Sequence, residues 1–160
     1  MKSSHKQTRN ATESRDVESV NAVIKALYEC VTFAPGTQPD YQRLRSLFHP
    51  RGRLTPPKDR SDLVLDIETF ISNSREHVIL TGLEKKGFHE KEVHRSTEVF
   101  GNIVHAFSTY ESRHLPTDEA PIQRGINSIQ LVFDNERWWV VSIMWDIERD
   151  NNPLPSQYIG

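Results

Sequence analysis

The sequence predicts one α+β domain in which three N-terminal helices pack on a strongly curved, mainly antiparallel sheet. Apolar residues recur at helical spacing in the first half of the chain, and from about residue 88 they alternate with a period of two. The length of 160 residues suits a single domain, which buries about 70% of the surface of its unfolded chain. We expect the domain to span 16–150, between a disordered tail at 1–15 and an extended tail at 151–160.

The charge balance excludes two classes of partner. The chain has 20 Lys and Arg and 22 Asp and Glu, mixed along its length, so no basic field favours nucleic acid or an anionic membrane. No stretch approaches the ~20 apolar residues that span a bilayer, and no apolar run near the N-terminus resembles a signal-peptide core. We therefore expect a cytoplasmic protein with neither a nucleic-acid nor a membrane partner.

Helical periodicity predicts three helices, at 17–31, 40–48 and 66–82. Ser14 or Asp16 is the expected N-cap of the first helix, and an aspartate precedes each of the other two. Cys30 lies within the apolar stripe of the first helix, which favours a buried small side chain over a disulfide or a metal ligand.

Four segments rich in β-branched and aromatic residues predict strands, at 88–100, 103–114, 122–134 and 137–147. The first carries many charges, as expected of a sheet edge. The last is apolar on both faces, and helices can cover only one of them. The other face predicts a homodimer formed through the sheet.

Three stretches resemble a known superfamily: DYQRLRSLFHPRGRLTPP, STEVFGNIVHAFSTYESR and RGINSIQLVFDNERWWVVSIMWDIER. They look like the nuclear-transport-factor-2-like superfamily, specifically its uncharacterised bacterial polyketide-cyclase-like branch. The resemblance covers about residues 16–155. It implies a cystatin-like cone whose helices and bent sheet enclose a mainly apolar pocket, and frequent dimerisation through the sheet. The superfamily includes isomerases, dehydratases, polyketide cyclases, transport factors and assembly domains, so the resemblance implies a fold rather than one activity.

Two side chains are candidate acid–base groups. Removal of a proton from carbon requires a carboxylate or His in a dry pocket. Asp146 ends the apolar last strand and by alternation shares a face with Trp138 and Met144. His49 follows the second helix, where it could titrate near neutral pH. The structural alternatives are an ion pair of Asp146 with an arginine and a surface or helix-capping role for His49.

Other residues are candidates for lining the pocket. Tyr28, Tyr110 and Asn127 could each present a polar group to a cavity, although core packing also explains both tyrosines. Asn127 stands in an apolar string and requires partners if it is buried. The complete set of predicted ligand-binding residues is Tyr28, Phe48, Tyr110, Asn127, Trp138 and Met144.

No cofactor or metal is predicted. The segment 89–94 has one residue too many between its histidines for the zinc-protease pattern, and a strand directs them to opposite faces. Glu90, Glu92, His94 and Glu98 would share one strand face, for which a solvated edge is the simpler explanation. The chain also lacks phosphate-binding and dinucleotide-binding glycine motifs.

These observations predict a domain that binds a small apolar molecule. The first alternative is a cofactor-independent lyase or isomerase, polyketide-cyclase-like or steroid-isomerase-like, that uses acid–base chemistry. The second is a non-catalytic dimeric interaction domain.

Overall fold

The computed structural model describes residues 11, 15–57 and 64–160, so most of the tail predicted at 1–15 lies outside the described residues. The helices are α2 (Val20–Val31), α3 (Tyr41–Leu47), α4 (Ile67–Leu80), α5 (Leu83–Lys86) and the short 3-10 helix η1 (Ser156–Tyr158). The strands are β1 (Phe48–Thr55), β2 (His89–Phe100), β3 (Ile103–Arg113), β4 (Gln123–Asp134) and β5 (Arg137–Ile147).

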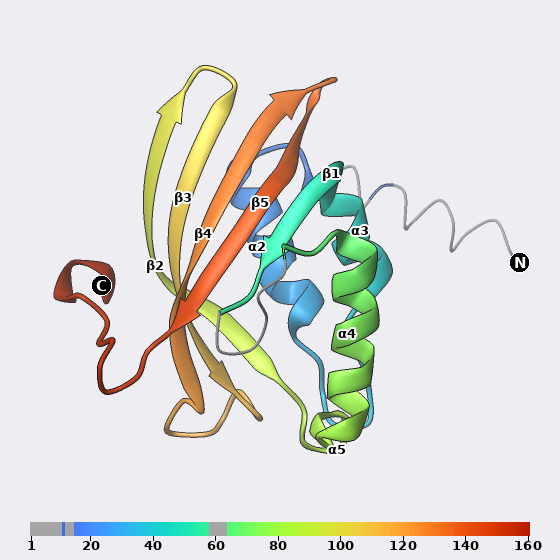
Figure 1. Cartoon of the computed structure of the whole chain (residues 1–160), viewed down its shortest axis with the longest axis vertical. Coiled ribbons are helices and arrows are strands. Elements are labelled where there is room, and N and C mark those ends of the chain that lie inside the picture. Colours follow the sequence, from blue (N-terminus) through green and yellow to red (C-terminus); the bar gives the residue numbers. More distant parts are fainter. Residues whose placement is uncertain (1–10, 12–14, 58–63) are drawn as a thin grey trace, which may run out of the picture.

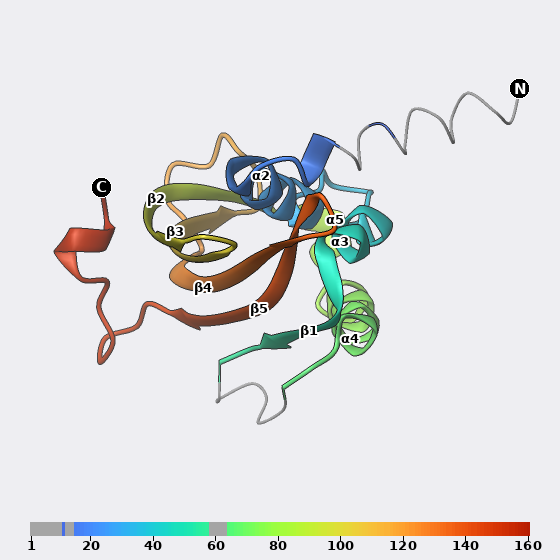
Figure 2. The same cartoon turned by 90° about the horizontal axis from the view of Figure 1, so that it is seen from above.

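The five strands form one sheet in the order β1-β5-β4-β3-β2. Strand β1 runs parallel to β5, and the other pairs are antiparallel. The sheet curves around α2, and the helices lie on its concave, inner face (Figures 1 and 2). The predicted fold class is thus confirmed, and the charged strand β2 is an edge strand as expected. No helix among the residues with assigned positions is long and apolar enough to cross a membrane.

Side-chain caps determine where the helices begin. Asp40 and Asp66 accept hydrogen bonds from the backbone N–H groups three residues later and cap α3 and α4, as predicted. The prediction for α2 was wrong, because Ser19 is its cap. Asp16 instead accepts two hydrogen bonds from the Arg43 guanidinium, at 2.7 and 2.9 Å, and ties the chain before α2 to α3. Helix α5, at four residues, is too short for periodicity to reveal.

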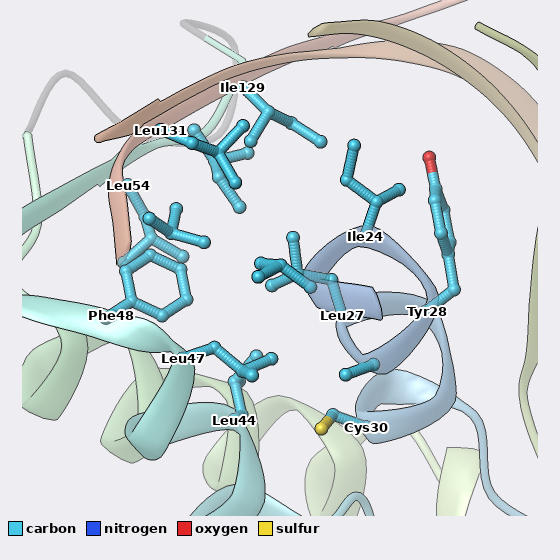
Figure 3. Packing of buried hydrophobic residues seen from close by; sticks show 14 of the residues in the cluster. Ile24, Leu27, Tyr28, Cys30, Leu44, Leu47, Phe48, Leu54, Ile129 and Leu131 are labelled. Carbon is cyan, nitrogen blue, oxygen red and sulfur yellow. The ribbon is translucent and has the colours of Figure 1, made fainter. Parts of the chain in front are cut away.

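The core lies between α2, α3 and the inner face of the sheet. Figure 3 shows Leu27 of α2 directed toward Leu47 and Phe48, with Ile129 of β4 above them. Buried apolar side chains from both layers form one cluster, which is the contact that holds helices and sheet together.

Two β-bulges change which side chains face the core. In β5 the register shifts so that Val141 has no partner in β4, and in β2 the same happens at Val93. A bulge inserts one residue and reverses the alternation beyond it. Trp138 therefore faces the helices, whereas Met144 faces the outer side of the sheet. The expectation that the two share a face was wrong.

The C-terminal segment returns along the outer face of the sheet. Tyr158 of η1 packs edge-on against Phe107 of β3, with ring centroids 5.0 Å apart. Thr109 Oγ1 donates a hydrogen bond to the Tyr158 carbonyl oxygen at 2.6 Å. The segment expected to be extended thus contains a 3-10 turn that covers part of β2 and β3.

Gly125 of β4 makes room for an aromatic ring on the inner face. A Cβ at this position would lie 2.6 Å from Tyr110 Oη and would also collide with the backbone carbonyl of Asp146. The phenol ring of Tyr110, which is 2% exposed, occupies the space above this glycine. Any side chain at 125 would displace that ring.

We therefore expect Gly125→Ala to lower the free energy of unfolding by about 1–3 kcal/mol, the usual range for overpacking a core. Urea denaturation measures this change. Thr97→Ala, an exposed substitution in β2, is the control and should change the stability by less than about 0.5 kcal/mol. Equal stability of the two variants would contradict the close approach of Tyr110 to Gly125.

Candidate functional site

A cavity of about 810 Å³ lies between the helices and the inner face of the sheet. Apolar side chains from α2, α4 and three strands make up most of its wall, including Leu27, Phe70, Ile129, Ile143 and Trp145. The rings of Phe70 and Trp145, which both line the cavity, make an edge-to-face contact at a centroid distance of 6.0 Å. The structure therefore provides an apolar compartment large enough for a small organic molecule.

Four of the predicted ligand-binding residues line this cavity. Tyr28 comes from α2, Phe48 from the start of β1, Tyr110 from β3 and Asn127 from β4. These segments are distant in sequence, and the curvature of the sheet brings them together. Figure 3 shows the Tyr28 hydroxyl directed away from α2 toward the sheet.

A chain of hydrogen bonds fixes Tyr28 and Asn127. The Ser108 hydroxyl donates to the Glu92 carboxylate, so its oxygen is left to accept from the Tyr28 hydroxyl at 2.6 Å. Tyr28 in turn accepts from the Asn127 amide Nδ2 at 3.1 Å. Arg95 forms an ion pair with Glu92 at 2.7 Å and completes the chain. The proton of Tyr28 is thus committed to Ser108.

Burial raises the pKa of Tyr28 well above its ordinary value of 10.0, and the hydrogen bonds with Ser108 and Asn127 offset this effect only in part. The phenol therefore stays protonated throughout the physiological range. It acts as a fixed polar group of the cavity wall and holds the Asn127 amide in place.

Glu90 is the carboxylate that lines the cavity, and no Lys or Arg of the described part of the chain does so. It accepts a hydrogen bond from Ser112 Oγ at 3.1 Å. Burial raises the pKa of Glu90 to about 7, and the Ser112 hydrogen bond opposes that shift without cancelling it. A carboxyl group with this pKa exchanges its proton near neutral pH.

Glu90 belongs to a row of polar side chains across three strands. It pairs with Ser112 of β3, and Ser112 pairs with Gln123 of β4. Adjacent strands are about 4.8 Å apart, so the Cα atoms of Glu90 and Gln123 are separated by about 10 Å with Ser112 between them. Gln123 also lines the cavity, and its side-chain amide has no hydrogen-bond partner among the described residues.

Sequence analysis missed the role of Glu90 because of the bulge at Val93. Simple alternation assigned Glu90, Glu92, His94 and Glu98 to one solvated face. The bulge instead leaves Glu90 and Glu92 on the inner face and turns His94 and Glu98 to the outer face. No motif marks Glu90. The signals that could have identified it are the aromatic Phe88 two residues before it and the small hydroxyl residue Ser112, which pairs with it in β3.

The two predicted catalytic residues lie outside the cavity. Asp146 is exposed on the outer side of β5, where its carboxylate accepts hydrogen bonds from Arg149 and from the Ile147 N–H, both at 2.8 Å. The bulge at Val141 places it there, opposite to the face expected from alternation. The ion pair with an arginine matches the structural alternative for this residue.

His49 is also on the outer side, at the start of β1. Its ring meets Trp139 edge-on at a centroid distance of 5.8 Å, and its Nδ1 accepts the Arg51 backbone N–H at 3.1 Å. It lines a second hollow, on the outer face of the sheet, together with residues of β2 and β3. His49 and Asp146 therefore do not share the cavity between helices and sheet.

The remaining predicted ligand-binding residues are placed elsewhere as well. Trp138 packs against the core and against Phe133, at a centroid distance of 5.3 Å, outside the cavity lining. Met144 is 51% exposed on the outer face.

No group of three or more His, Cys, Asp or Glu side chains in residues 15–57 and 64–160 is arranged to hold a metal ion.

Comparison with solved structures identifies the fold. A nuclear-transport-factor-2-like protein of unknown function from Silicibacter pomeroyi has 17% identity and a TM-score of 0.52, covering 81% of this chain and 92% of that one. A proposed ketosteroid isomerase from Parabacteroides distasonis has 11% identity and a TM-score of 0.57, covering 84% and 92%. An uncharacterised protein with a cystatin-like fold from Caulobacter vibrioides has 13% identity and a TM-score of 0.60, covering 82% and 89%.

At these identities the similarity shows the fold alone, which is nuclear-transport-factor-2-like, or cystatin-like. The predicted fold is confirmed, and the superfamily with its polyketide-cyclase-like branch stays a prediction. No protein-family model matches the sequence, and no curated protein is similar enough to match it.

The raised pKa of Glu90 makes stability depend on pH. Below its ordinary pKa of 4.5, Glu90 is protonated in both the folded and the unfolded state and contributes nothing. As the pH rises from 4.5 to about 7, the unfolded state loses the proton first, so the folded state becomes less stable. Above about 7 the loss is complete and amounts to about 3 kcal/mol.

We therefore expect Glu90→Gln to gain stability relative to the wild type by up to about 3 kcal/mol between pH 4 and pH 8. Urea denaturation of both proteins across this range measures the difference. Glu119→Gln, in an exposed loop, is the matched control and should show no such trend. Parallel pH profiles for the wild type and Glu90→Gln would contradict the desolvation of Glu90.

Proposed function

We propose that the protein binds a small, mainly apolar molecule in the cavity between α2, α4 and the inner face of the sheet. The observation that supports this function is the cavity itself, whose volume of about 810 Å³ is within the range of small-molecule sites, roughly 300–1,000 Å³. Its wall is mostly apolar, with a few polar groups carried by neighbouring strands.

The charges of the wall indicate which molecules are excluded. An anionic ligand would find no Lys or Arg in the described lining and would be repelled by Glu90 once that group ionises. An uncharged ligand with one hydrogen-bonding group fits better. Gln123 has a side-chain amide without a described partner, and Asn127 uses one amide hydrogen on Tyr28 and retains a second.

Filling the cavity should abolish binding. We expect the uncharged dye N-phenyl-1-naphthylamine to bind saturably, with a rise in its fluorescence. Val31→Trp places an indole at a half-buried lining position on α2 and should weaken dye binding at least about tenfold, by loss of cavity volume. Fluorescence titration measures the dissociation constant.

The matched control is Ile79→Trp, at an exposed position on α4 outside the lining, which should bind the dye as the wild type does. Circular dichroism verifies that both variants are folded. If the wild type shows no saturable binding, or if both variants bind equally well, the cavity is not a ligand site.

A second candidate function is that of a dimeric interaction domain, favoured by the outer face of the sheet. Several apolar side chains there are exposed, including Phe100 at 83%, Ile103 at 58% and Met144 at 51%. Phe100 and Ile103 line the hollow that contains His49. A second copy of this chain could cover them by the same face, since a two-fold dimer uses one self-complementary surface.

Sedimentation tests this arrangement. We expect the wild type to be a dimer at micromolar concentration and the double variant Ile103→Lys with Met144→Lys to be a monomer, because four lysines would be buried in each interface. Ile79→Lys, at a similarly exposed apolar position on α4, should remain dimeric. A monomeric wild type would exclude the dimer.

The enzymatic alternative, a cofactor-independent isomerase or lyase, now depends on Glu90 rather than on Asp146 or His49. Both of these lie outside the cavity, whereas Glu90 is inside it.

A further inference from the structure

We propose that Ser128, His105 and Glu98 form a hydrolytic triad on the outer face of the sheet, which cleaves small esters with an apolar acyl group. Ser128 is the nucleophile, His105 is its general base, and Glu98 orients the imidazole ring. The three side chains lie on the opposite side of the sheet from the cavity, so this activity goes beyond the proposed binding function and does not depend on it.

The strand register brings the three side chains together. Glu98 of β2 pairs directly with His105 of β3, and Ser128 of β4 is a diagonal neighbour of His105, two residues before its partner Gln130. Direct and diagonal neighbours on one face of a sheet are within reach of long side chains. The bulge at Val93 is required for this arrangement, because it turns Glu98 to the outer face.

The hydrogen bonds have the direction that a serine nucleophile requires. The Nδ1 atom of His105 is 3.2 Å from Glu98 Oε1, and its Nε2 atom is 3.0 Å from Ser128 Oγ. A carboxylate only accepts hydrogen bonds, so Nδ1 carries the imidazole proton and Nε2 is left to accept from the Ser128 hydroxyl. A triad is recognised by this geometry of nucleophile, base and carboxylate, whatever the fold or the order of the residues in the chain.

The hollow on the outer face provides a place for the acyl group. His105 and Glu98 line this hollow, and so do the apolar side chains of Ile103, Val132 and Val141. Ile103 is 58% exposed and Val141 is 36% exposed, so both are open to a ligand. An apolar acyl chain can pack against these side chains beside His105, which gives the substrate class.

Gln130 is the donor that can stabilise the negative oxygen of the reaction. It follows Ser128 by two residues on the same strand face, about 7 Å along the strand, and it lines the hollow. Its side chain is exposed, and its amide has no hydrogen-bond partner among the described residues. The N–H groups of this amide are therefore available to the oxygen of an ester carbonyl.

The reaction needs no cofactor. Ser128 Oγ forms a bond to the carbonyl carbon, its proton passes to His105 Nε2, and the carbonyl π electrons move to the oxygen that Gln130 contacts. When the carbonyl re-forms, the bond to the alcohol oxygen breaks, and the alcohol leaves with the proton from His105. Water then repeats both steps on the acyl group, which releases the acid and restores the Ser128 hydroxyl.

A fluorophosphonate that carries an alkyl chain tests the nucleophile directly. The activated serine oxygen bonds to phosphorus, its proton passes to the histidine, and fluoride leaves. We expect mass spectrometry of the digested wild type to find the adduct on Ser128. Ser128→Ala should abolish this adduct and lower kcat/KM for 4-nitrophenyl butyrate about 100-fold or more, and His105→Gln should slow labelling by a similar factor.

Two further variants separate the roles of the neighbouring side chains. Ser96→Ala is the matched control, because Ser96 is exposed on the same face opposite Phe107 and has no histidine partner among the described residues. It should be labelled as the wild type is. Glu98→Ala should lower the maximal rate of labelling and leave the half-saturating probe concentration unchanged, because Glu98 acts through His105 rather than on the substrate.

Three results would overturn the proposal. The first is the absence of an adduct on wild-type Ser128, which includes the case in which a dimer covers the outer face. The second is equal ester hydrolysis by the wild type and Ser128→Ala. The third is equally fast labelling of the wild type and His105→Gln. Since labelling of the wild type requires no substitution, the first test does not depend on the folding of a variant, and binding of N-phenyl-1-naphthylamine reports separately on the cavity.

Discussion

The curvature of the sheet around α2 is the constraint on which the site depends. A flat sheet would press its inner face against the helices, and the side chains would fill the space between the layers. Here the sheet curves around α2 instead (Figure 2). The alternation of side chains is offset at the bulges at Val93 and Val141. The same two positions therefore select the side chains that face the cavity.

Polar groups on the inner face of the sheet differ in how many hydrogen-bond and ion-pair partners they have. The chain from Arg95 through Glu92, Ser108 and Tyr28 to Asn127 gives each member a partner and ties α2 to the sheet. Glu90 has only the hydrogen bond from Ser112, which compensates its desolvation in part. A buried carboxyl that reduces stability at neutral pH is more readily explained by function than by folding.

The outer face of the sheet exposes apolar side chains, and the C-terminal segment covers only part of it. Tyr158 packs on Phe107, whereas Ile103 and Met144 stay exposed. Asp146 and His49 belong to this face, with partners that account for both. A role in assembly on the outer face and a role in binding on the inner face are compatible, because the sheet separates the two surfaces.

The sequence by itself determined the fold class, the caps Asp40 and Asp66, and both ends of the four strands β2 to β5 to within about a residue, because helical and strand periodicities are local properties. It also indicated Tyr28 and Asn127 as polar residues in apolar surroundings. Only the tertiary structure decided which face each strand residue occupies, since one inserted residue at a bulge reverses alternation and leaves no mark in the composition. Glu90 entered the cavity, and Asp146 left it, for that single physical reason.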